Sequence, residues 1–276
     1  MVERVPHLDR DRLSVLIALL LLISVLLRFI RLPEAAWSLG VLGSPLEIRI
    51  TSTMFLIALV AALMAMGTRY VLAAHPDAPD RLPRPLYLSW VLPSLLGGMV
   101  AYLVELAPTE GIWAVGLLWM ALVSGLAVAA EFSALSTEDP NYARARLALN
   151  ILAYLLAFAL FYFVYRTRVR SILTASGTML FAFLVALDLL SVADVTVGRV
   201  ALYAGVVALL VGEATWAINY WRLGNWTGSL FLLVVFYLSA GVAHQHLLGK
   251  LNRWVVLEFV LIAAAALALI LAFAPA

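Results

Sequence analysis

The sequence predicts an all-α fold: a polytopic integral membrane helix bundle with about nine transmembrane helices in one domain over residues 1–276. Hydrophobic residues make up 65% of the chain and charged residues only 12%, and the mean hydropathy is +1.04. A soluble domain needs far more polar surface than this composition provides. The apolar runs are long and continuous, without the period-two alternation of barrel strands, so they are typical of membrane helices.

Each span is placed where about 20 predominantly apolar residues can cross roughly 30 Å of hydrocarbon. The expected spans are Leu13–Leu32, Thr51–Leu72, Leu86–Ala107, Ile112–Phe132, Leu147–Tyr165, Ser171–Ala193, Val200–Trp221, Gly228–Leu248 and Trp254–Phe273. The apolar run Leu13–Leu27 in the first span resembles a signal peptide, but Arg28 and Arg31 follow this run and no small-residue cleavage site does, so we expect the span to remain uncleaved.

The connections between spans are short. Pro33–Ile50 is partly apolar and is expected to lie in the membrane interface, with a re-entrant turn as the alternative. Ala73–Pro85 contains four prolines and is expected to be an extended, solvated linker. Pro93 and the Gly97–Gly98 pair are potential interruptions of the third span.

Orientation follows from the basic residues. With a cytoplasmic N-terminus, eleven of the 18 Lys and Arg residues lie inside, and seven, including Arg166, Arg168 and Arg170, lie outside. The positive-inside rule therefore favours this orientation. High Arg, Ala and Leu usage is associated with GC-rich bacterial genomes, so we expect a multi-pass protein of the bacterial cytoplasmic (inner) membrane.

Composition also excludes several classes of site. The chain has no cysteine, so no disulfide, thiolate catalyst, iron–sulfur cluster or cysteine zinc site is possible. A net charge of +2 does not indicate nucleic-acid binding. No metal-binding, phosphate-binding or nucleophile motif is present, so the sequence assigns no metal, no cofactor and no catalytic residue.

Polar residues inside spans are costly and mark candidate sites. Glu213 lies near the centre of its predicted span and shares a helix face with Trp216 and Tyr220. Counting from the next turn places Glu213 level with Tyr237, so a hydrogen bond between them is expected. These four residues are the ligand or ion candidates, and a polar clasp between helices is the alternative.

A second polar cluster lies near the last turn. The same counting places Gln245 and His246 level with Glu258, which predicts a contact between an imidazole and a carboxylate near one membrane face. His244 and His246 are two residues apart on a helix, so they should point to different sides and chelate a metal poorly. The cluster comprises His244, Gln245, His246, Arg253 and Glu258, and a structural network holding the last hairpin is the alternative.

Three further acidic residues lie inside the predicted spans. Asp188 is a secondary candidate for a proton relay, and pairing with Arg199 across a turn is the simpler interpretation. Glu105 and Glu131 lie near span ends and are expected at the membrane interface.

A family resemblance rests on GEATWAINYW (Gly212–Trp221), Phe236–Tyr237, QHLLGKL (Gln245–Leu251) and LEF (Leu257–Phe259). These stretches resemble an uncharacterised family of bacterial multi-span membrane proteins, classed as a domain of unknown function. The resemblance covers the C-terminal third and implies a bacterial inner-membrane protein, but no site roles.

Three functional hypotheses follow. The first is a non-catalytic accessory or assembly subunit of a larger membrane complex, in contact with membrane lipids and other subunits, and binding a lipid or a pigment. The second is a transporter or channel for an ion or small molecule that uses Glu213. The third is a membrane-embedded lipid-modifying enzyme that uses His244, His246 and Glu258. The first is favoured because polar residues are few and loops are short, whereas an enzyme needs several convergent polar groups.

Overall fold

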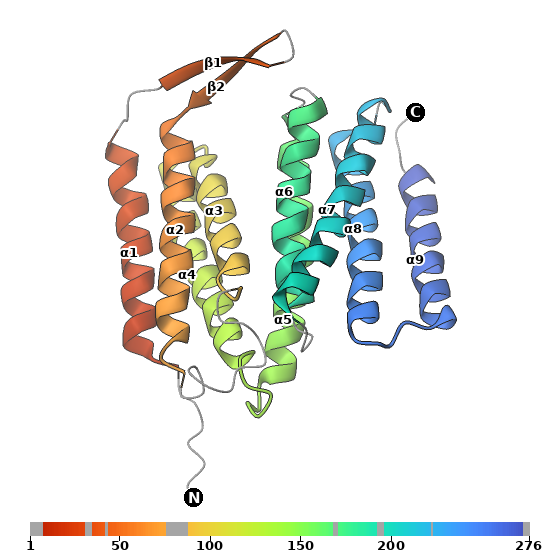
Figure 1. The fold of residues 1–276 in the computed structure, drawn as a ribbon. Coiled ribbons are helices and arrows are strands. Elements are labelled where there is room, and N and C mark those ends of the chain that lie inside the picture. Colours follow the sequence, from red (N-terminus) through yellow and green to blue (C-terminus); the bar gives the residue numbers. More distant parts are fainter. Residues whose placement is uncertain are drawn as a thin grey trace, which may run out of the picture. The chain divides into compact units, whose positions relative to one another are not determined.

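The computed structural model describes residues 8–30, 35–41, 44–75, 88–167, 171–191, 196–221 and 223–272, with only the backbone in the two strands. The chain forms two compact units (Figure 1). Unit 1 comprises Met1–Asp80 and Pro93–Asn141, and unit 2 comprises Arg81–Leu92 and Tyr142–Ala276. The expectation of a single transmembrane domain stays a prediction.

Unit 1 is built on helices and carries a β-hairpin. Its elements are α1 (Arg10–Phe29), β1 (Ala35–Val41), β2 (Ser44–Ile50), α2 (Ser52–Leu72), most of α3 (Val91–Glu105) and α4 (Glu110–Ser133). Side-chain caps start three of these helices, because Asp9, Thr51 and Thr109 each accept hydrogen bonds from backbone N–H groups of the first turn.

Unit 2 is a run of helices joined by short turns, so sequence neighbours are antiparallel (Figure 1). Its elements are α5 (Tyr142–Arg166), α6 (Ser171–Leu190), α7 (Val197–Asn219), α8 (Asn225–Leu247) and α9 (Arg253–Ala272). Each helix packs on the next, and α8 also packs against α5 and α6. The start of α5, the end of α6, the start of α7 and the end of α8 therefore lie at the same end of unit 2.

The predicted helical membrane fold is confirmed. Seven of the described helices are long and apolar enough to cross a membrane. Outside these seven are α9 and the 15-residue α3, which begins at Val91 and not at Leu86. Pro93 lies in the first turn of α3, where its missing N–H has no intrahelical partner to lose, so it does not interrupt the helix.

The first connection forms a β-hairpin, which the sequence expectations did not include, and its expected place in the membrane interface stays a prediction. β1 and β2 pair antiparallel, with Ala35 opposite Ile50 and Val41 opposite Ser44. The alternation of Leu46, Ile48 and Ile50 with Glu47 and Arg49 is the period-two pattern of a strand, and it lay inside the segment predicted to be interfacial or re-entrant. The expected linker Ala73–Pro85 lies largely outside the described residues.

The carboxylates of unit 1 occupy two environments. Arg28 pairs with Glu110 at 2.8 Å and with Glu105 at 3.9 Å, and its guanidinium lies 5.4 Å from the ring centre of Trp113. The Glu131 side chain is fully buried inside the protein at the end of α4, and its expected position near the membrane interface stays a prediction.

Close helix contacts and buried hydroxyls set the packing of unit 2. The hydroxyls of Thr178 on α6 and Thr215 on α7 are 2.8 Å apart and fully buried. Gly228 of α8 lies against the ring of Tyr165 on α5, whose hydroxyl donates to the carbonyl of Ile218 at 3.4 Å. These contacts fix the helices that surround the candidate site.

Candidate functional site

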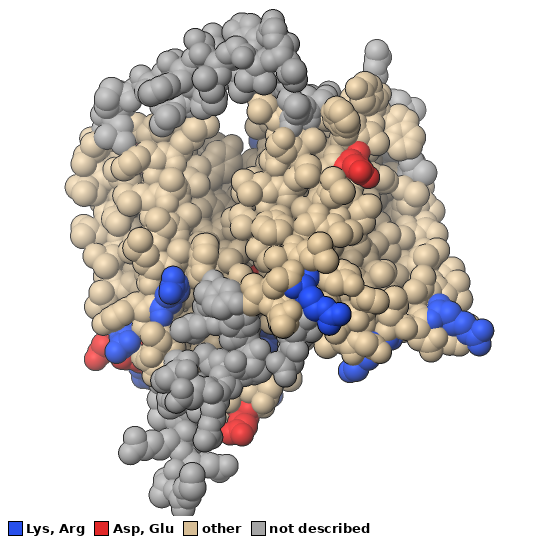
Figure 2. Space-filling model, viewed as in Figure 1, with Lys and Arg blue, Asp and Glu red and all other residues tan. Residues whose placement is uncertain are grey.

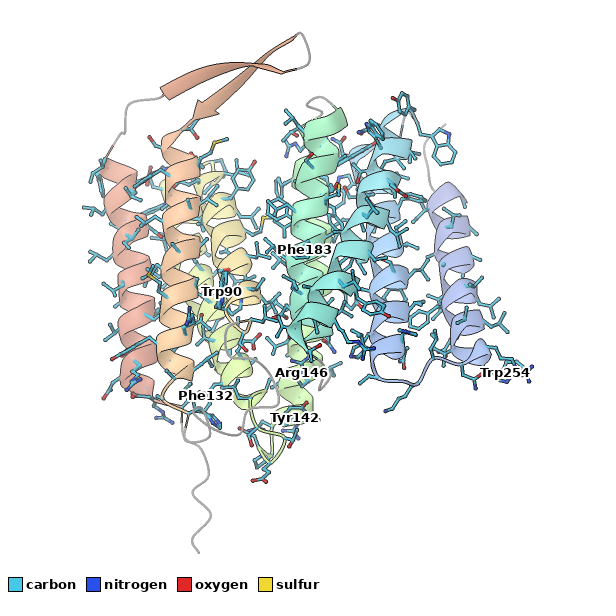
Figure 3. The ribbon with its side chains drawn as sticks, viewed as in Figure 1. Trp90, Phe132, Tyr142, Arg146, Phe183 and Trp254 are labelled. Carbon is cyan, nitrogen blue, oxygen red and sulfur yellow. The ribbon has the colours of Figure 1, made fainter. Side chains whose placement is uncertain are left out.

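Four polar side chains form a stripe along α5. Tyr142, Arg146, Asn150 and Tyr154 are spaced by four residues, so they lie on one face of the helix. Figure 3 labels Tyr142 and Arg146 at the lower end of this helix in that view. The stripe faces the end of α6 and the last turns of α8, the helices that pack against α5.

Between these three helices lies a cavity of about 240 Å³, which we call the polar cavity. Leu189 and Leu190 of α6 and Ala240 and Gly241 of α8 form its apolar wall. The α5 stripe and His244 of α8 form its polar wall. Apolar surface on one side and convergent polar groups on the other are the usual make-up of a small-molecule site.

Arg146 interacts within the protein, whereas the other members of the polar wall leave polar atoms without a hydrogen bond to a described residue. The His244 Nε2 atom is buried and has no hydrogen-bond partner in the described part of the chain. The side chains of Tyr142, Asn150 and Tyr154 also make no hydrogen bond to any described residue. The Tyr154 ring packs 5.6 Å from the ring of Tyr237 and 6.0 Å from that of Phe236, and Tyr154 also lines the cavity.

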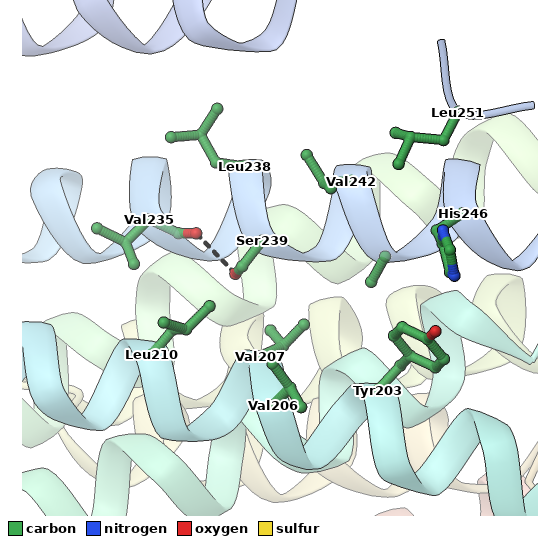
Figure 4. Close-up of a pocket in the computed structure, with 11 residues that line it drawn as sticks. Tyr203, Val206, Val207, Leu210, Val235, Leu238, Ser239, Val242, His246 and Leu251 are labelled. Carbon is green, nitrogen blue, oxygen red and sulfur yellow. Dashed lines mark hydrogen bonds between the residues drawn. The ribbon is translucent and has the colours of Figure 1, made fainter. Parts of the chain in front are cut away.

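On the other side of α8 lies a larger hollow of about 590 Å³, which we call the α7–α8 groove (Figure 4). Its middle is apolar, and Figure 4 shows Leu210 and Val207 of α7 facing Val235 and Ser239 of α8. The Ser239 hydroxyl donates to the carbonyl of Val235 at 2.7 Å, so it offers little to a ligand. The groove is lined by Tyr203, Val206, Val207, Leu210, Val235, Leu238, Ser239, Val242, Ala243, His246 and Leu251.

The two histidines of α8 face different surfaces. His244 lines the polar cavity, whereas His246 is exposed, and its ring lies 5.5 Å from that of Tyr203 at one end of the groove. This agrees with the expectation that residues two apart on a helix point to different sides. In the described residues, no group of three potential metal ligands comes together.

Glu213 lies on an outward-facing stripe of α7. Its side chain is exposed, as are Trp216 at 54% and Tyr220 at 83%, while the neighbouring Thr215 and Ile218 are buried. Glu213 lies six residues before Asn219, so it is about 9 Å from the end of α7 and not at the centre.

The expected hydrogen bond between Glu213 and Tyr237 is absent from the described contacts. The Tyr237 ring instead lies 5.6 Å from that of Tyr154 on α5 and 5.7 Å from that of Phe259 on α9. Equal counting from a turn fixes depth along two helices, but it does not fix the direction in which each side chain points.

The residues of the predicted interfacial cluster also do not come together in the structure. Gln245 is half-buried, and Glu258 is exposed on α9 without an ion pair to any described residue. Arg253 is exposed and lies 5.9 Å from the ring centre of Trp254. The contact expected between Glu258 and the Gln245–His246 pair is therefore not formed.

Asp188 and Arg199 do not pair either. Asp188 is 3% exposed near the end of α6, and its carbonyl accepts a hydrogen bond from the Ser191 hydroxyl at 2.7 Å. Arg199 is exposed in the first turn of α7 and has no ion pair in the described part of the chain. The Asp188 side chain is buried and the Arg199 side chain is exposed, so the two lie in different environments.

The comparisons with known proteins place the chain in a family. A family model described as "Protein of unknown function (DUF5656)" matches residues 32–273. The chain belongs to this family. No curated protein and no solved structure matches the chain.

The DUF5656 match corrects the extent of the resemblance, which covers most of the chain and not only the C-terminal third. A family of unknown function carries over no site roles, so the geometry has to supply them. Seven of the described helices of this DUF5656 protein are long and apolar enough to cross a membrane, and the face drawn in Figure 2 carries few charged side chains.

Sequence reasoning missed the α5 stripe. Asn150 and Tyr154 lie inside the expected span Leu147–Tyr165, whereas Tyr142 and Arg146 lie in the connection before it. The signal was the four-residue spacing that continues across the predicted helix start. It becomes visible only once α5 is known to begin at Tyr142.

Proposed function

We propose that this protein is a non-catalytic accessory subunit of a membrane complex, and that a transmembrane helix of another subunit docks along α7 and α8. The observation that carries the proposal is the position of Glu213, an exposed carboxylate within a spanning helix. A charged residue at the bilayer centre costs about 2.5–3.5 kcal/mol, and the cost falls toward the interface. A partner that pairs with Glu213 would remove this cost.

The surface around Glu213 has the form of a helix-docking face. Tyr203, Val206, Leu210, Glu213 and Tyr220 follow one another at spacings of three, four, three and seven residues, so they form one stripe along α7. Val206 is 48% exposed and Leu210 is 43% exposed. The α7–α8 groove contains the first three of these residues, so the stripe continues the groove toward the other end of α7.

The chemistry of this face specifies the partner. An apolar helix with small residues would fill the middle of the groove, because close approach favours packing between helices in lipid. At the level of Glu213 the partner helix should carry a lysine, an arginine or another hydrogen-bond donor. Such an intramembrane charge pair satisfies both subunits.

The two other hypotheses receive less support. Glu213 lines neither the polar cavity nor the α7–α8 groove, which does not favour a transport pathway through it. His244, His246 and Glu258 face separate surfaces, which does not favour acid–base catalysis by the three together. The same proposal includes the bacterial inner membrane as the location and a cytoplasmic N-terminus, supported by composition and by the distribution of basic residues.

Site-specific photocrosslinking in cells tests the docking face. A photoreactive amino acid at Leu210 or Trp216 should capture the same integral membrane protein, identified by mass spectrometry and co-purifying with the unsubstituted chain. The matched control is Val260, which is 55% exposed on α9 and should not capture that protein.

Dependence on Glu213 makes the test specific. Glu213→Leu should lower the yield of the complex by about 3- to 30-fold, since hydrogen bonds between membrane helices contribute about 0.6–2 kcal/mol. Glu213→Gln keeps a polar side chain at this position, so the yield of the complex should fall less than in Glu213→Leu. Capture of lipid alone, capture of a second copy of this chain, or a yield unchanged in Glu213→Leu would contradict the proposal.

A further inference from the structure

The geometry points to the polar cavity of α5, α6 and α8 as a binding site for a small oxyanion, a phosphate or carboxylate group. The cavity lies on the opposite side of α8 from the α7–α8 groove, so this inference does not rest on the proposed docking of a partner helix.

The polar wall is rich in hydrogen-bond donors. A guanidinium carries five N–H donors in a planar fork that matches two oxygens of a carboxylate or phosphate, so Arg146 can serve a ligand in addition to its protein contacts. Two phenol hydroxyls, from Tyr142 and Tyr154, and the amide of Asn150 add further donors on the same helix face. No Asp or Glu is among the described residues that line this cavity.

His244 lies across from this stripe on α8. Its Nε2 atom is buried without a hydrogen-bond partner among the described residues. Leaving a buried polar group unpaired costs about 1–3 kcal/mol, and a ligand in the cavity would remove that cost. In the tautomer with a proton on Nε2, the imidazole donates to an oxyanion.

The volume of the cavity and its position along the helices limit which ligands it can hold. The cavity volume of about 240 Å³ equals the liquid volume of about eight water molecules, which is enough for a phosphate or a short carboxylate but not for an acyl chain. Tyr142 is the first residue of α5, and Leu190 is the last of α6. The site therefore lies at the end of the helices, where a dissolved anion or the phosphate of a lipid headgroup could reach it.

Calorimetric titration of the full chain in uncharged, lipid-free detergent tests this assignment. The probes are inorganic phosphate, acetate and a short-chain phosphatidic acid. We expect saturable binding of at least one probe at one site per chain. Arg146→Gln should weaken it about ten- to a hundred-fold, the effect of losing a hydrogen bond to a charged group. His244→Leu and Asn150→Leu should each weaken it less.

Arg144→Gln is the matched control, because Arg144 lies two residues away on α5, is exposed and does not line the cavity. It should change the affinity by less than about two-fold, since exposed charges contribute little. Arg146→Lys keeps the charge but not the planar fork and should retain part of the affinity. Each variant must melt within a few degrees of the parent, which separates lost binding from lost folding.

The three probes distinguish the sources of the oxyanion. Binding of phosphate or acetate supports the site and identifies a dissolved anion as its ligand. Binding of phosphatidic acid alone supports the site and identifies a lipid headgroup. The assignment is overturned if no probe binds saturably, or if Arg144→Gln and Arg146→Gln weaken binding equally.

Discussion

Two threonine hydroxyls link α6 and α7 inside unit 2. Thr178 and Thr215 are fully buried, and their hydroxyl oxygens are 2.8 Å apart. Each hydroxyl has one proton, so one of them donates to the other, which donates to a carbonyl of its own helix. Thr215→Val keeps the shape of the side chain and removes the bond between helices. We expect a loss of about 0.6–1.7 kcal/mol in the free energy of unfolding in detergent, the size of such bonds in membrane proteins.

A double-mutant cycle provides the control for this prediction. If the bond is formed, Thr178→Val and Thr215→Val should be less destabilising together than the sum of their separate effects. Strict additivity of the two losses would show that the two hydroxyls do not interact.

Residue positions were predictable from sequence only in part. The depth of Glu213 in its span was overestimated, and its direction was not available, because the buried face of α7 is as apolar as its exposed face. A soluble helix reveals its buried face through a contrast between polar and apolar residues, and a helix in lipid lacks this contrast. For the same reason, the hydrophobic pattern of α7 could not show whether Glu213 faces Tyr237.

Close approach of α5 and α8 depends on one glycine. A Cβ atom placed on Gly228 would lie 2.6 Å from the Tyr165 Cε1 atom, inside normal contact distance. Gly228→Ala should therefore displace the Tyr165 ring from the last turns of α7 and destabilise unit 2 by about 1–3 kcal/mol, the usual cost of overpacking. Thermal unfolding in detergent measures this loss.

Gly205→Ala is the matched control, because nothing lies within 4 Å of a Cβ atom placed there on α7. It should be neutral or slightly stabilising, since alanine favours a helix over glycine. Shortening the clashing side chain with Tyr165→Leu should recover part of the loss in Gly228→Ala. A Gly228→Ala protein that melts with the parent would contradict the packing of these two helices.

Elements were more predictable than residues. Length and hydropathy placed the ends of the spans within a few residues, with the largest differences at the starts of α3 and α5. The requirement to satisfy every backbone group in lipid makes a long apolar run a helix, whatever its detailed sequence. The hairpin of β1 and β2 was missed because it is a short connection, to which this requirement does not apply.

Topology can be tested on the whole molecule because the natural chain has no cysteine. Single cysteines can therefore be placed at exposed positions, at Lys250 after α8 and at Thr167 after α5, which lie at opposite ends of unit 2. With a cytoplasmic N-terminus, a membrane-impermeant maleimide should label Thr167→Cys in intact cells and Lys250→Cys only after permeabilisation. The reverse pattern would overturn the orientation expected from the positive-inside rule.

Helix α8 lines both the polar cavity and the α7–α8 groove. One face of this helix presents Gly241 and His244 to the polar cavity, and the other presents Val242 and His246 to the α7–α8 groove. A rotation of α8 about its axis therefore changes the shape of the polar cavity and that of the α7–α8 groove together. Occupants that prefer different rotations of this helix would influence each other's affinity by the same factor in both directions, as thermodynamic linkage requires.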